Sequence, residues 1–100
     1  MPNEIHITAI AFRDGDVWVV QGIEYDIAAH ASDPANLPDA FTRAVIENAV
    51  ISEHLRGEPM KGIKPAPAHF KEMYERATTA VKAVEPRKPE RLSVDSDIRL

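Results

Sequence analysis

Residues 4–21 have the sequence EIHITAIAFRDGDVWVVQ, and this stretch decides the fold. In residues 4–12 the apolar, largely β-branched side chains alternate between two faces, which is typical of a strand. The pair Asp14-Gly15 follows, and glycine tolerates the positive φ that tight hairpin turns need. Residues 17–21 are again rich in β-branched residues. The pattern therefore predicts an antiparallel hairpin with its turn at residues 13–16.

A third strand and a helix are predicted next. Residues 26–31 place Ile27, Ala29 and Ala31 on one face, after Gly22, a residue type that often marks a bend. A helix is expected over residues 38–56, because Pro38 fits a first turn and Gly57 can end the last one. Its main apolar stripe, expected to face the core, comprises Phe41, Ala44, Val45, Ala49, Ile51 and Leu55. A smaller apolar pair, Ile46 and Val50, falls on the opposite side.

The last third of the chain predicts a connector, a second helix and an undecided end. Residues 58–67 contain three prolines, which favour extended backbone. Residues 67–85 have helical apolar spacing and precede Pro86. Residues 92–100 alternate in polarity, which fits either a terminal strand or a disordered tail. We expect an α+β domain over residues 1–85: a three-stranded antiparallel sheet and two helices in two layers (βββαα), with residues 86–100 as a tail or extra strand.

Composition excludes several classes of protein. The 100 residues include no Cys, so disulfides, a thiol nucleophile and sulfur-based zinc sites are excluded. No apolar run reaches the roughly 18 residues of a membrane span, and the first residues do not resemble a secretory leader. A net charge of −4 argues against general nucleic-acid binding. These features predict a soluble cytoplasmic protein.

Charge is divided unevenly along the chain. Residues 1–60 have three basic and ten acidic residues, whereas residues 61–100 have nine basic and six acidic ones. Such asymmetry indicates either separate tasks or self-association, although an ordinary fluctuation of surface charge explains it equally well.

The motifs of the chain do not predict catalysis. The histidines, at positions 6, 30, 54 and 69, contain no pair at the helical i, i+4 spacing of metal ligands, so surface or half-buried roles are expected. Gly57 and Gly62 have the spacing of a phosphate loop, but Ile63-Lys64 replaces the required Lys-Ser/Thr. We therefore expect a protein that is not an enzyme, with no catalytic, metal or cofactor site.

Two alternative functions involve other kinds of ligand. Phe70, Met73 and Tyr74 could line a small-ligand or regulatory site between the sheet and the second helix, although ordinary core packing is the simpler interpretation. An RNA-binding module is the other alternative, because six basic residues could form a strip: Lys61, Lys64, Lys71, Arg87, Lys88 and Arg91. A solvated surface is the simpler interpretation of these six.

The ordered features over residues 5–57 resemble the N-terminal domain of HicB-like antitoxins. The resemblance rests on the Asp14-Gly15 hairpin, the aromatic strand Val17-Trp18-Val19-Val20 and a helix that opens Leu37-Pro38-Asp39-Ala40-Phe41. In place of the family's Pro-Gly-Cys stretch this chain has residues 21–25, Gln-Gly-Ile-Glu-Tyr. The resemblance implies a sheet-plus-helix domain related to a degenerate ribonuclease-H-like layout. It also implies a non-catalytic partner of a small basic HicA-like toxin.

These expectations give the candidate partners and interface. The 43 residues from 58 to 100 leave too little chain for a helix-turn-helix, so operator DNA binding is not expected. Trp18 and Tyr25 are candidates for the partner face. Ile46 and Val50 are candidates for a homodimer or helix-packing surface. The acidic first part of the chain fits a cationic partner.

Overall fold

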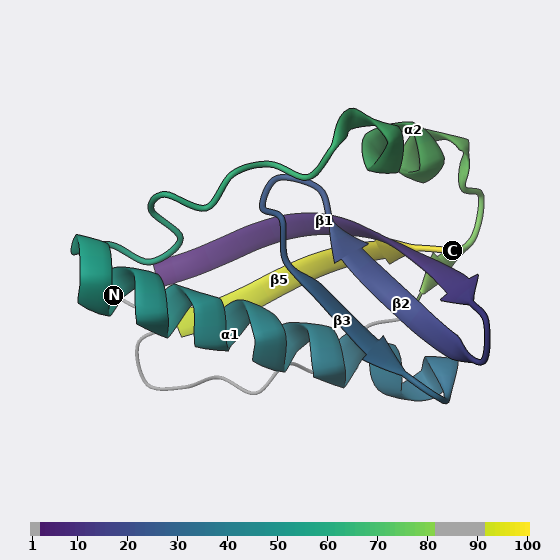
Figure 1. Ribbon diagram of the computed structural model, residues 1–100, viewed down its shortest axis with the longest axis horizontal. Coiled ribbons are helices and arrows are strands. Elements are labelled where there is room, and N and C mark those ends of the chain that lie inside the picture. The colour runs from purple at the N-terminus through teal and green to yellow at the C-terminus, as the bar shows by residue number, and fades with distance from the viewer. Residues whose placement is uncertain (1–2, 82–91) are drawn as a thin grey trace.

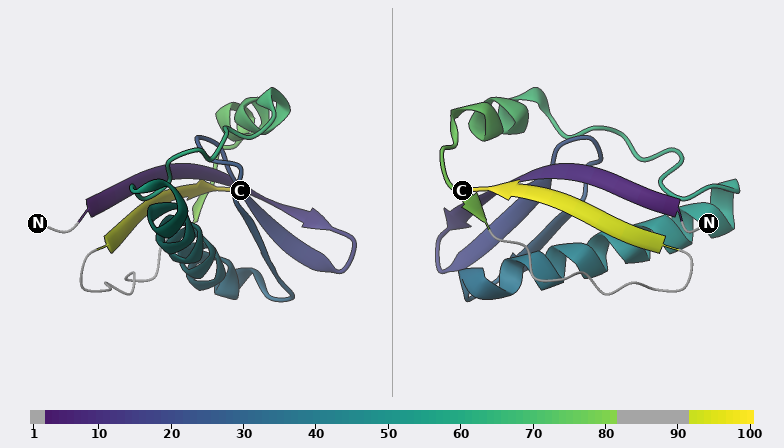
Figure 2. Two further views of the ribbon diagram at one scale, coloured as in Figure 1. Left: turned by 60° about the vertical axis from the view of Figure 1, so that its left-hand side comes forward. Right: turned by 180° about the vertical axis from the view of Figure 1, so that it is seen from behind.

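The computed structural model describes residues 3–81 and 92–100, which form one mixed sheet and two helices. The helices lie on opposite sides of the sheet (Figures 1 and 2), so the predicted two-layer arrangement is corrected to a sheet with one helix on each face. The predicted α+β class is confirmed. The elements in chain order are β1 (Asn3–Asp14), β2 (Val17–Gly22), β3 (Ala28–Ala31), the 3₁₀ turn η1 (Pro34–Asn36), α1 (Leu37–Arg56), α2 (Ala68–Arg76), β4 (Ala80–Val81) and β5 (Leu92–Arg99).

The sheet has the strand order β3-β2-β1-β5-β4. β1 pairs antiparallel with β2, and β2 with β3, as the sequence predicts. β5, however, lies parallel to β1 on its other side, and the two-residue β4 pairs antiparallel with β5. The prediction of a purely antiparallel, three-stranded sheet is therefore corrected to a mixed sheet. A parallel pair needs a long crossover, which local sequence patterns do not reveal.

The hairpin between β1 and β2 forms at the predicted place. Its turn is shorter than predicted, because Asp14 already pairs with Val17 and only Gly15 and Asp16 lie between the strands. Gly15 has a φ of 63°, the left-handed conformation expected at this turn.

Helix α1 covers one face of the sheet. Gly57 ends it with a φ of 87°, and its N–H donates to the carbonyl of Glu53 at 2.9 Å, as the sequence predicts. The fully covered stripe of α1 comprises Leu37, Phe41, Val45, Ala49 and Ser52. It packs on β-strand residues that include Ile7, Ala9, Val20, Val94 and Ile98.

Two residues assigned to this stripe from sequence are exposed instead. Ile51 is 57% exposed and Leu55 is 67% exposed. Ile51 lies roughly 200° around the helix from the buried Ala49, because each residue turns about 100°. Leu55 belongs to the last turn, which extends past the ends of β1 and β5 (Figure 1).

Helix α2 packs on the other face at one end of the sheet. The rings of Phe12 and Phe70 stack with centroids 6.0 Å apart, and the hydroxyl of Tyr74 donates to Asp97 at 2.6 Å. The helix ends at Arg76, whereas the sequence predicted a helix to residue 85; residues 82–85 lie outside the described residues. Ala77 is already extended, and the chain joins the sheet at Ala80.

The end of the chain is a strand, which decides between the two interpretations left open for residues 92–100; residues 86–91 lie outside the described part. Val94 and Ile98 are buried toward α1, while Asp95 and Asp97 are exposed. No helix within the described residues has the length and apolar character needed to cross a membrane.

Candidate interaction surface

The face of the sheet away from α1 carries acidic side chains over its uncovered part. Along β1, Ile5 and Ile7 point toward α1, so alternation places Glu4 and His6 on the opposite face. The parallel register brings Asp95 beside His6 and Asp97 beside Thr8. We call this the open face, and it gathers carboxylates from strands that are far apart in the sequence.

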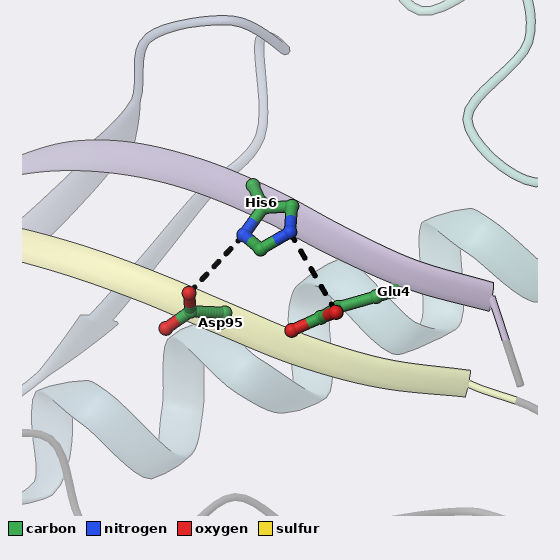
Figure 3. A group of neighbouring side chains, drawn as sticks. All are labelled: Glu4, His6 and Asp95. Carbon is green, nitrogen blue, oxygen red and sulfur yellow. Dashed lines mark hydrogen bonds and ion pairs between the residues drawn. The ribbon is translucent and has the colours of Figure 1, made fainter.

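His6 lies between two carboxylates on the open face (Figure 3). Its Nδ1 is 3.1 Å from Oδ2 of Asp95, and its Nε2 is 3.8 Å from Oε2 of Glu4. All three side chains are exposed, and each has an atom that could ligate a cation within 4.8 Å of the others. The carboxylates, however, contact opposite nitrogens of the ring, and one ion binds only one of these nitrogens. The arrangement therefore favours hydrogen bonding by the ring over chelation by all three residues.

Glu24 accepts hydrogen bonds from Thr8 at the point where the pairing of β1 with β2 ends. The N–H of Thr8 donates to Oε1 of Glu24 at 2.7 Å, and the Thr8 hydroxyl donates to Oε2 at 2.6 Å. The carbonyl of Thr8 accepts from the N–H of Ile23 at 2.9 Å. Beyond this point the chain turns away from β1, so the first part of β1 is not paired with β2.

The turn after β2 is held by the connector that precedes α2. The N–H of Ala66 donates to Ile23 at 3.0 Å, and the N–H of Asp26 donates to Lys64 at 2.7 Å. A side chain cannot be added at Gly22 without contact, because a Cβ there would lie 2.8 Å from both Ile7 Cδ1 and the Tyr25 carbonyl oxygen. These contacts fix Tyr25 next to the half of β1 that is not paired with β2.

A solvent-open groove of about 570 Å³ lies along this half of β1. Its floor includes Met60, which is buried in the core although its φ is 69°. The buried hydroxyl of Ser52 accepts the Met60 N–H at 2.6 Å and itself donates to the carbonyl of Asn48 at 2.7 Å. The groove is lined by Glu4, Ile5, His6, Tyr25, Glu58, Pro59 and Met60, and we call it the edge groove.

The four interface candidates from sequence do not lie on one surface. Tyr25 lines the edge groove. Trp18 pairs with Arg13 at the other end of β1, about 20 Å along the strand from the edge groove. Its side chain packs against the core. Ile46 also packs against the core, whereas Val50 is 52% exposed.

The other candidate residues take part in the attachment of α2. Phe70 stacks on Phe12, and Arg99 lies 4.2 Å from the ring centre of Tyr74. Burial raises the pKa of the Tyr74 phenol, and the hydrogen bond to Asp97 and its negative charge raise it further. Met73 is half-buried. Of the six residues in the basic strip, Lys61, Lys64 and Lys71 are exposed and the other three lie outside the described residues.

Sequence reasoning missed the residues that line the open face. It treated His6 as an isolated histidine, because its partner Asp95 is 89 residues away and the parallel pairing of β1 with β5 leaves no local signal. The alternation in residues 4–12 could have placed Glu4 beside His6, and the alternation in residues 92–100 could have placed Asp95 and Asp97 together.

Comparisons with models of protein families, with curated proteins and with solved structures found no significant match for this chain.

Proposed function

We propose that this chain is a non-enzymatic interaction module of the HicB-like antitoxin type, which binds and neutralises a small basic toxin. The observation that carries the proposal is the acidic open face. Glu4, Asp95 and Asp97 lie on it, and Glu58 extends it into the edge groove. A patch of one charge steers an oppositely charged protein toward it and disfavours wrong partners.

The layout of the domain supports the family assignment. Three antiparallel strands, connected by an Asp-Gly hairpin and a short turn, precede a long helix that covers one face. This order of elements is compatible with the sheet-plus-helix domain that the resemblance implies.

We also propose that the module is a homodimer that associates through the end of α1. Val50, Ile51 and Leu55 are each more than half exposed within the last two turns of this helix. Clustered apolar side chains of this kind mark association surfaces more often than single exposed ones do. Sedimentation of the chain and of Ile51→Lys tests this: a dimer that the substitution dissociates supports it, and a monomer across micromolar concentrations contradicts it.

Co-expression tests the antitoxin function. The chain is produced together with a small basic HicA-like toxin, and cell growth and co-purification are measured. We expect growth to be restored by the natural chain and restored less by Glu4→Gln combined with Glu58→Gln. The matched control, Asp16→Asn combined with Glu47→Gln, removes the same charge from exposed positions outside the open face. Toxicity that persists with the natural chain contradicts the proposal.

A further inference from the structure

The first half of β1 pairs with β5 but not with β2, and its free side faces the edge groove. Thr8 directs its N–H and its C=O toward the side of β2, as its contacts with Glu24 and Ile23 establish. Backbone groups of a strand alternate between its two sides, so His6 and Glu4, two and four residues earlier, direct theirs the same way. Within the described residues, β2 pairs with β1 only from Ala9 onward.

These backbone groups form an open strand edge. No backbone hydrogen bond from a turn or loop in residues 3–81 and 92–100 reaches Glu4 or His6. Proteins usually block such edges, because an exposed row of N–H and C=O groups pairs with any extended chain. Glu24 blocks the edge at Thr8 only. The stretch from Glu4 to Thr8 spans about 13 Å, which suits a strand of roughly four residues.

The surroundings of this edge define the chemistry of an occupant. The edge groove contributes the carboxylates of Glu4 and Glu58, and its lining within the described residues includes no Lys or Arg. Met60 and Ile5 give it an apolar side toward the core. A strand laid along this edge alternates its side chains between the two faces of the sheet, so basic residues would meet the carboxylates and apolar ones would face the core side.

We propose that the edge of β1 at Glu4 and His6 binds an extended basic peptide segment of a protein partner, which joins the sheet as an additional strand. Main-chain hydrogen bonds supply affinity in this mode, and the alternate side chains supply selectivity. The site goes beyond the proposed function, because it depends on the geometry of the edge and would serve a basic partner that is not a toxin.

The test uses the full chain and a six-residue peptide that alternates lysine and valine. Binding is followed by the amide resonances of the protein in an NMR titration. We expect shifts at residues 4–7, at Tyr25, at Glu58 and at Met60, together with slower hydrogen exchange of the Glu4 and His6 amides. A peptide with glutamate in place of lysine should bind at least about tenfold more weakly.

Two N-methylated peptides separate strand addition from simple charge attraction. One is methylated on the amides of the odd residues and the other on those of the even residues. A strand at an edge uses only one of these sets for pairing, so one methylated peptide should lose binding and the other should retain it. If both bind as the parent peptide does, or if the shifts centre on α2, the proposal is overturned.

Protein variants supply a second readout. His6→Pro removes an N–H that faces the open edge, so the chain should fold and lose peptide binding, since proline is tolerated where the N–H faces solvent. Ile7→Pro removes an N–H that pairs with β5 and should unfold the chain. If His6→Pro also unfolds the chain, the double variant Glu4→Gln/Glu58→Gln takes its place. This double variant must weaken peptide binding more than the control double variant Asp16→Asn/Glu47→Gln does. A peptide that fails to bind overturns the edge site and leaves the co-expression result unaffected.

Discussion

Thr8 donates two hydrogen bonds to the carboxylate of Glu24, one from its backbone N–H at 2.7 Å and one from its hydroxyl at 2.6 Å. The pair lies where the β1–β2 ladder ends, and within the described residues the earlier part of β1 pairs with β5 alone. Charge-assisted hydrogen bonds of this kind are stronger than neutral ones. Glu24 therefore fixes where the sheet stops and where the edge groove begins.

Glu24→Ala should destabilise the fold. It removes the acceptor for both donors of Thr8, and we expect a loss of about 1 kcal/mol in the free energy of unfolding, because the freed groups can still reach water. Urea denaturation measures the loss. Glu47→Ala, an exposed residue of α1, is the control and should change stability by less than about 0.5 kcal/mol. Equal effects of the two substitutions would contradict the role given to Glu24.

Gly22→Ala should lower the free energy of unfolding more than Gly15→Ala does. The physical reason differs between the two positions. The new Cβ at position 22 would lie 2.8 Å from Ile7 Cδ1, 2.8 Å from the Tyr25 carbonyl oxygen and 3.2 Å from that of Ile27. Overpacking of this kind costs about 1–3 kcal/mol, and here two of the contacts are backbone atoms that cannot rotate away.

At Gly15 nothing lies within 4 Å, and only the positive φ opposes a side chain. Asparagine tolerates that conformation. Gly15→Asn should therefore be milder than Gly15→Ala, whereas Gly22→Asn should be at least as harmful as Gly22→Ala. Thermal unfolding of the four variants gives the comparison. If Gly22→Asn were also milder than Gly22→Ala, crowding would not be the cause at position 22.

The first half of the fold could be predicted because its signals are local. The alternation around Ile5 and Ile7, the Asp14-Gly15 pair and the stop at Gly57 each depend on near neighbours. The end of α2 could not be predicted in this way. The helical spacing of the sequence continues past Arg76, whereas the chain leaves the helix and pairs with β5 from Ala80. Tertiary pairing there outweighs helix propensity.

The candidate surface was predictable only in part. Tyr25 was identified from sequence and lines the edge groove. Glu4, His6 and Asp95 were not identified as a group, since they meet only when β5 pairs with β1 in parallel. Nothing in the local pattern of either segment indicates which strand it will join or in which register.

The contact between Tyr74 and Asp97 makes the stability of the fold depend on pH in the alkaline range. Burial and Asp97 raise the pKa of Tyr74 above its ordinary value of 10.0, so the folded state holds the phenolic proton more tightly than the unfolded state. The stabilisation is complete below that ordinary value and is lost as the pH rises through the folded-state pKa.

Tyr74→Phe should remove this part of the pH dependence. Urea unfolding of both proteins between about pH 8 and about pH 11 measures it, and the difference in stability between them should shrink at the alkaline end. Asp97→Asn should move the Tyr74 pKa back toward its usual range in a spectrophotometric titration. A constant difference between the natural chain and Tyr74→Phe over this range would contradict the assignment.

Ser52 connects α1 to the floor of the edge groove, and its removal should loosen that floor. Ser52 is only 2% exposed, and its hydroxyl is the acceptor for the Met60 N–H. Ser52→Ala leaves this buried N–H without its partner, which costs about 1–3 kcal/mol. The exposed Ser32→Ala is the control and should be neutral. Hydrogen exchange should accelerate at the Met60 amide in Ser52→Ala, and an unchanged exchange rate would mean that Ser52 does not hold the groove.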